Sequence, residues 1–137
     1  RKAVVYAHQI MTSPVITASV NQPLDAIWRL FSKLGFHHLP LVDDQQHIQG
    51  IVSDRDILRF AANNNPRQGS VVISRLMSRS VITAARQTEV RTLAEVMGRR
   101  AIGALPIEDD ELNLVGIVSR SDILRALVNH GPLELWA

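Results

Sequence analysis

The stretch Gly50-Ile-Val-Ser-Asp-Arg-Asp-Ile-Leu-Arg59 returns 66 positions later as Gly116-Ile-Val-Ser-Arg-Ser-Asp-Ile-Leu-Arg125. In each copy a short apolar run predicts a strand, and the serine after it predicts the start of a helix. The same offset places Leu39-Pro-Leu-Val-Asp-Asp44 on Leu105-Pro-Ile-Glu-Asp-Asp110, and Met11-Thr-Ser-Pro-Val-Ile-Thr17 on Met77-Ser-Arg-Ser-Val-Ile-Thr83. The chain therefore contains an internal repeat. Because one repeat is too short to bury its apolar face alone, we expect two that pack on each other with a pseudo-two-fold axis.

Each repeat is predicted to run in the order β-α-β-β-α, so the fold class is α/β (α+β), with two small sheets through which the repeats pack. A short strand at 15–17, matched by 81–83, precedes a helix that ends at Gly35. Asn21 or Gln22 is expected at or near the N-cap of this helix, with Pro23 at its first position. Pro40 predicts a strand start or a sheet edge. We expect repeats over 5–62 and 71–130, a linker at 63–70 and a tail at 131–137.

The composition excludes several classes of protein. The 137 residues include no cysteine, which excludes disulfides, zinc–thiolate sites and thiol catalysis and favours the cytoplasm. No apolar run is long enough to span a membrane. The net charge of +2, without a basic block, makes nucleic acid an improbable partner. The chain begins at Arg1, so we expect a fragment of a longer protein.

These motifs, in this order and occurring twice, resemble the tandem CBS-domain pair, also called a Bateman module. The resemblance covers nearly the whole chain. It implies a regulatory module that binds an adenine nucleotide (AMP, ADP or ATP) or S-adenosylmethionine in clefts between the repeats and signals to an attached or partner effector. It also implies that two chains associate as a homodimer.

The resemblance carries over to particular residues by motif match. In the family, the serine and aspartate of the Gly-Ile-Val-Ser-x-x-Asp motif contact ribose and phosphate, and the early strand lines the base pocket beside the Leu-Pro turn. The ribose and phosphate contacts fall on Ser53, Asp56, Ser119 and Asp122, and the base pocket falls on Ile16, Thr17, Pro40, Ile82, Thr83 and Pro106.

The chemistry of these residues suits an adenosine ligand. Short aliphatic runs offer a slot for the flat base, and a carboxylate on the first turn of a helix, such as Asp56, can accept both ribose hydroxyls. A phosphate binds backbone N–H groups at a helix start together with arginine, and Arg55 and Arg120 lie there. Of the neighbours His37 and His38, which a strand points to opposite faces, His38 is the candidate for a phosphate contact.

A purely structural interpretation of Ser-x-x-Asp stays open. The pattern also predicts a capping box, in which serine caps the helix and the acid three residues later accepts the serine N–H. Both roles are compatible, because a cap beside a cleft can also touch ribose. The two sites are expected to be unequal, the one with Asp56 being stronger, since its neighbourhood adds Arg55 and the pair His37-His38 where the second repeat has Ser121 and Gly103-Ala104.

No catalytic or metal-binding motif is present in the sequence. The acidic run 108–111 lacks the spacing of a calcium loop and predicts a solvated hairpin. Without a phosphate-binding glycine loop or a nucleophile–base pattern, we expect no enzyme, no metal and no required cofactor. The alternative function is a ligand-free dimerisation module. We expect the dimer to use two apolar helix stripes, formed by Leu24, Ile27, Trp28 and Phe31, and by Val90, Leu93, Val96 and Met97.

Overall fold

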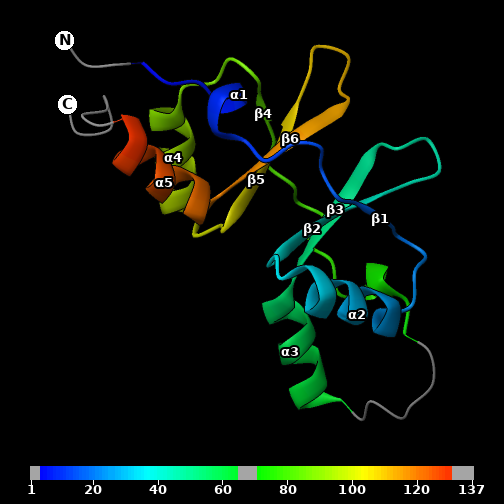
Figure 1. Cartoon of the computed structure of the whole chain (residues 1–137). Helices are drawn as coiled ribbons and strands as arrows, with labels where there is room; N and C mark the ends of the chain where they lie inside the picture. Colours follow the sequence, from blue (N-terminus) through cyan, green and yellow to red (C-terminus); the bar gives the residue numbers. More distant parts are fainter. Residues whose placement is uncertain (1–3, 65–70, 131–137) are drawn as a thin grey trace. The chain divides into compact units, whose positions relative to one another are not determined.

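The computed structural model describes residues 4–64 and 71–130. Most of the predicted linker and the whole predicted tail lie outside these residues. The chain forms two compact units: unit 2 is Ile16–Val81, and unit 1 combines Arg1–Val15 with Ile82–Ala137 (Figure 1). Both units have the predicted mixed α+β architecture, each with a three-stranded sheet. In the described residues, no helix is long and apolar enough to cross a membrane.

Unit 2 follows the predicted order of elements. It contains β1 (Ala18–Ser19), α2 (Leu24–Leu34), β2 (His38–Val42), β3 (Ile48–Ser53), α3 (Asp54–Asn63) and the short 3-10 helix η1 (Ile73–Arg75). The strand order is β1-β2-β3, with β1 parallel and β3 antiparallel to β2. One side of α2 and of α3 contributes to the core of the unit, which consists of Ile27, Phe31, Leu39, Leu41, Val52, Ile57 and Ile73.

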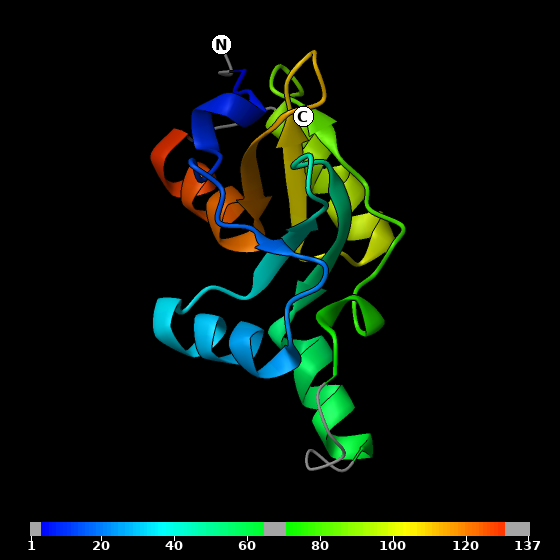
Figure 2. The same ribbon diagram turned by 90° about the vertical axis from the view of Figure 1, so that its right-hand side faces the viewer.

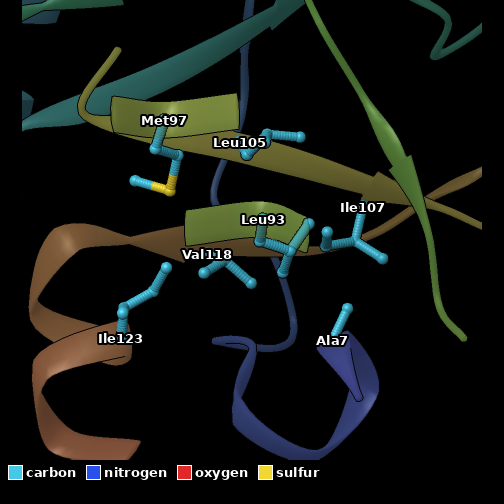
Figure 3. Packing of buried hydrophobic residues seen from close by; sticks show 7 residues of the cluster. All are labelled: Ala7, Leu93, Met97, Leu105, Ile107, Val118 and Ile123. Carbon is cyan, nitrogen blue, oxygen red and sulfur yellow. The ribbon is translucent and has the colours of Figure 1, made fainter. Parts of the chain in front are cut away.

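Unit 1 repeats this arrangement, with the helical turn α1 at the position that η1 has in unit 2. Its elements are α1 (Ala7–Ile10), β4 (Ala84–Ala85), α4 (Val90–Arg100), β5 (Ala104–Glu108), β6 (Leu114–Ser119) and α5 (Arg120–His130). The strand order is β4-β5-β6 with the same directions as in unit 2. α1 lies beside α5 in both views (Figure 1 and Figure 2). Figure 3 shows side chains from three helices and two strands meeting in one core: Ala7, Leu93, Met97, Leu105, Ile107, Val118 and Ile123.

Each unit takes its lead-in segment from the start of the other sequence repeat. In unit 2 the Val71 carbonyl accepts the first N–H of α2, from Leu24, at 2.7 Å. In unit 1 the Val5 carbonyl accepts the first N–H of α4, from Val90, at 2.8 Å. The pairs Ser78–Ile51 and Thr12–Ile117 then add a bridge to the edges of β3 and β6. The two compact units therefore exchange these segments relative to the sequence repeats.

A methionine on each exchanged segment explains the glycine of the repeated motif. A Cβ atom on Gly50 would overlap the Met77 sulfur, and one on Gly116 would overlap the Met11 sulfur. Both glycines lie in the last strand of their sheet, opposite Leu41 and Ile107 respectively. Glycine is required at both positions because in each unit a methionine side chain crosses directly over the strand.

Three local predictions were wrong. The N-cap of α2 is Pro23, without a side-chain cap, because the Val71 carbonyl binds the Leu24 N–H. The first strands lie at Ala18–Ser19 and Ala84–Ala85, just after the predicted runs, since they pair only with the ends of β2 and β5. Pro40 lies in the central strand, where its missing N–H is harmless because β1 pairs with Leu41 and Val42 only.

The apolar stripes expected to form a dimer surface are largely core. Ile27 and Phe31 are buried in unit 2, and Val90, Leu93 and Met97 are buried in unit 1. Trp28 is the exception, because 41% of its surface is exposed. The stripes therefore do not supply the surface on which the dimer prediction was based.

Candidate functional site

In unit 2, Ser53 ends β3 and caps α3, where it forms the predicted capping box with Asp56. The Asp56 N–H donates to Ser53 Oγ at 3.1 Å, and the Ser53 N–H donates to Asp56 Oδ2 at 2.8 Å. The other carboxylate oxygen, Oδ1, lies 3.7 Å from Arg59 Nη1, and 30% of the Asp56 side chain is exposed. One oxygen of Asp56 is therefore fixed by the backbone, while the other is only loosely engaged.

In unit 1, the equivalent capping box is buried and more heavily bonded. Asp122 Oδ2 accepts the Ser119 N–H at 2.9 Å and the Ser119 hydroxyl at 3.1 Å. Oδ1 accepts hydrogen bonds from Arg125 Nη1 at 3.0 Å and from the Thr12 hydroxyl at 3.4 Å. Only 5% of the Asp122 side chain is exposed. Both of its oxygens are committed to the protein.

The residues between serine and aspartate also differ between the units. In unit 2, Asp54 Oδ2 binds His37 Nδ1 at 2.8 Å, and Oδ1 accepts the Arg55 N–H at 2.8 Å. Burial raises the pKa of Asp54, but the hydrogen bonds from His37 and the Arg55 backbone outweigh it and hold the pKa below 3.8. The positive charge of His38, when protonated, acts in the same direction.

Unit 1 has a cation in place of this acid. Arg120 stands at the position of Asp54, and its N–H donates to the Gly103 carbonyl at 3.2 Å. Its side chain is exposed. Ser121 follows, and within residues 4–64 and 71–130 no acceptor binds the Ser121 N–H. Arg55 and Arg120 thus both lie on the first turn of their helix, with side chains exposed to solvent.

The remaining predicted residues lie along the strands before these helices. Ile16 is 47% exposed, and Thr17, Ile82 and Thr83 are half-buried in the segments that lead into β1 and β4. His38 is half-buried at the start of β2, opposite Ser53 in the antiparallel pairing. Pro40 and Pro106 are buried in the central strands and present little surface to a ligand.

Sequence reasoning missed Thr12, His37, Asp54 and Arg125 as parts of these sites. For His37 and Asp54 a signal existed, since the hairpin prediction brings the start of one strand to the end of the next. The register pairs His38 with Ser53, so their neighbours His37 and Asp54 meet. No sequence pattern indicated that Thr12 contacts the site, because the exchange of lead-in segments joins Thr12 to Asp122 across 110 positions.

The acidic run forms the hairpin turn between β5 and β6, as predicted. Asp109 Oδ1 accepts the backbone N–H groups of Glu111 and Asn113, both at 2.9 Å. The Asn113 N–H is the main cause that lowers the pKa of Asp109. In the described part of the chain, no three His, Asp or Glu side chains gather as metal ligands. A shallow hollow of about 340 Å³ beside the turn is lined by His8, Arg86, Gln87, Asp109, Asp110 and Glu111.

The family model for the CBS domain matches the chain twice, over residues 7–63 and 73–129. The chain belongs to the CBS-domain family, and it contains a tandem pair of these domains. The resemblance inferred from the motifs is confirmed.

A curated relative is the L-aspartate semialdehyde sulfurtransferase of Methanocaldococcus jannaschii. It is 31% identical over 125 residues, which cover 91% of this chain and 24% of the relative. This chain therefore spans about a quarter of that protein.

Two solved structures are similar over most of their length. The CBS domain pair of protein MJ0100, in complex with 5′-methylthioadenosine and S-adenosyl-L-methionine, has a TM-score of 0.83 and 30% identity, covering 93% of this chain and 98% of that one. The protein CBSX2, in complex with AMP, has a TM-score of 0.80 and 24% identity, covering 90% of this chain and 96% of that one. The second similarity supports the fold.

Proposed function

We propose that this chain is a regulatory module that binds adenosine-containing ligands and signals their presence to an effector in the cytoplasm. The observation that carries the proposal is the Asp56 carboxylate, which Ser53 holds through Oδ2 while Oδ1 remains accessible on the first turn of α3. A carboxylate fixed in this way can accept both hydroxyls of a ribose. The MJ0100 pair, which binds two adenosine derivatives, shares this fold at 30% identity.

The two sites are proposed to bind unequally, with the site at Asp56 stronger than the site at Asp122. A ribose that approaches Asp122 must displace Arg125 or Thr12, because these two residues bind Oδ1. At Asp56 it meets an oxygen whose nearest partner is 3.7 Å away. The ligand contacts to Ile16, Thr17, His38, Ile82 and Thr83 remain part of the proposal.

Titration calorimetry with AMP, ADP, ATP, S-adenosylmethionine and 5′-methylthioadenosine tests the function. A ligand present at 100 times its Kd should stabilise the protein by roughly 2.7 kcal/mol in parallel melting experiments. Asp56→Ala should weaken binding about tenfold or more, because a hydrogen bond to a charged acceptor is lost. Asp44→Ala, on an exposed hairpin of the same unit, is the matched control and should bind as the parent does.

The alternative function, assembly without a ligand, is favoured by exposed leucines at equivalent positions of the two last helices. Leu58 is 56% and Leu124 is 61% exposed. We infer that these residues contact a second copy of the chain, since a symmetric dimer requires a self-complementary surface. Light scattering at micromolar concentration should give a dimer mass for the parent and for Leu112→Glu, which changes an exposed hairpin. It should give a monomer mass for Leu58→Glu, and a monomeric parent contradicts the dimer.

No catalytic role is proposed for this chain. The sulfurtransferase name belongs to a relative of which the chain spans 24%. The proposed module needs no cofactor beyond its regulatory ligand, and its effector is either attached to it or a separate protein. If no adenosine ligand changes the melting temperature while a dimer is present, the assembly function replaces the regulatory one.

A further inference from the structure

The Asp54 carboxylate is held from two sides at the start of α3. Oδ2 binds His37 Nδ1 at 2.8 Å, and Oδ1 accepts the Arg55 N–H at 2.8 Å. The backbone supports this geometry, because the Asp54 N–H donates to the His37 carbonyl at 3.1 Å. The side chain nevertheless remains 35% exposed. A negative charge is thus fixed at the surface one residue after Ser53.

This carboxylate accepts a backbone N–H group at the start of α3 that an incoming anion could otherwise use. The first N–H groups of a helix attract anions because they lack partners within the helix. In α3 these groups are already satisfied: Asp54 N–H by His37, Arg55 N–H by Asp54, and Asp56 N–H by Ser53. A phosphate that approaches Ser53 therefore meets a like charge and no free backbone donor.

The equivalent residues of unit 1 show that the motif does not require this acid. Arg120 replaces Asp54, and Gly103 replaces His37, so neither the carboxylate nor its histidine partner is present. The serine and the aspartate of the capping box are the same in both units. The acid–histidine pair is therefore present in unit 2 and absent from the equivalent positions of unit 1.

We propose that Asp54, positioned by His37, is a specificity-determining residue that makes the site of unit 2 select adenosine ligands with an uncharged or cationic 5′ group over those with a 5′ phosphate. This inference rests on the proposed function, since it concerns which ligand the Asp56 site takes. It predicts a preference for a thioether or sulfonium derivative of adenosine.

The test compares AMP with 5′-methylthioadenosine, which share the nucleoside and differ in the charge of the 5′ group. Titration calorimetry at pH 8 should show that Asp54→Asn tightens AMP binding roughly three- to tenfold, as expected for removing a like charge several ångströms away in a partly solvated site. Binding of 5′-methylthioadenosine should change less than about twofold, since no charge pair is involved. Asp44→Asn, the same charge change on the hairpin of unit 2, should alter neither ligand.

A double variant locates the effect. In an Asp56→Ala background, Asp54→Asn should no longer change AMP binding, because the site that it tunes is disabled.

The possible outcomes separate this inference from the proposed function. If the parent binds both ligands and Asp54→Asn leaves their affinity ratio unchanged, the specificity role is overturned while adenosine binding stands. An Asp54→Asn effect that persists without Asp56 overturns the placement of the residue at that site. If the parent binds neither ligand, the proposed function and this inference both fail.

Discussion

The first turns of α3 and α5 contain the same serine and the same aspartate, yet the two aspartates have different surroundings. Asp56 is 30% exposed and has one loosely engaged oxygen, whereas Asp122 is 5% exposed and accepts hydrogen bonds from three residues. The difference comes from residues outside the motif, such as Thr12 on the exchanged segment. A shared motif thus fixes the cap, while its neighbours decide whether the carboxylate remains available to a ligand.

The largest expected effect separates the two aspartates by stability. Asp122→Ala should lower the free energy of unfolding by about 3 kcal/mol, because it leaves Arg125 and the Ser119 N–H without their buried acceptor. Asp56→Ala should cost only about 1 kcal/mol, as for an ordinary helix cap. Urea unfolding of the two variants measures the difference. Equal losses of stability in the two variants would contradict the different roles that we assign to the two aspartates from their burial.

An intermediate effect on the free energy of unfolding is expected at the C-terminal ends of α2 and α4. α2 ends at Gly35 with φ 71°, and α4 ends at the equivalent Ala101 with φ 52°. The left-handed conformation costs a residue with a Cβ about 1 kcal/mol, which glycine avoids. Ala101→Gly should therefore raise the free energy of unfolding by about 1 kcal/mol, and Gly35→Ala should lower it similarly.

Thermal melting of both variants is the measurement for this pair. The two substitutions are controls for each other, since they exchange the same two residues at the same repeat position. A loss of stability in Ala101→Gly would mean that the greater freedom of glycine in the unfolded chain outweighs the relief of strain at this helix end.

The smallest effect concerns acid stability and belongs to unit 2. The pKa of Asp54 is lower in the folded protein than its ordinary value of 3.8, so the ionised group stabilises the fold above that pH. This contribution is lost as the pH falls through the lowered pKa. It amounts to well under about 1 kcal/mol, because solvent screens a side chain that is 35% exposed.

Comparison of the parent with Asp54→Asn checks this expectation. The parent should be slightly more stable in urea at pH 6, and the difference should shrink as the pH falls below 3.8. Asp44→Asn provides the same charge change away from a histidine pair. A difference that grows as the pH falls would reverse the sign and contradict the account.

Much of the fold and the capping interactions at the candidate site were predictable from local sequence rules. Gly35 at the end of α2 and the Ser53–Asp56 box follow from capping preferences that depend on a few adjacent residues. The N-cap of α2 could not be predicted, because its partner is the Val71 carbonyl after the linker. The repeat offset identifies equivalent residues, such as Val5 and Val71. It does not say whether a lead-in segment pairs with its own repeat or with the other one, because both pairings fit the same sequence pattern.

The environment of the aspartates was unpredictable for the same physical reason. The Thr12 hydroxyl reaches Asp122 only because the first residues of the first repeat join unit 1. By contrast, the His37–Asp54 contact follows from the hairpin register and was predictable from the pairing of the two strands. Burial of Pro40 and Pro106 depends on the packing of the central strands, which the sequence does not specify.

The exchange of lead-in segments also sets an order of events during synthesis of the chain. Unit 2 is one continuous stretch, Ile16–Val81, so all its parts are available before β4 and the rest of the second repeat have been made. Unit 1 needs Val5 and Thr12 from one end and α5 from the other, and its first segment must wait while unit 2 is synthesised. Because closing the longer loop costs more chain entropy, unit 1 should be the later unit to fold. A ribosome that stalls in the second repeat would therefore hold a complete unit 2 beside an unpaired N-terminal segment.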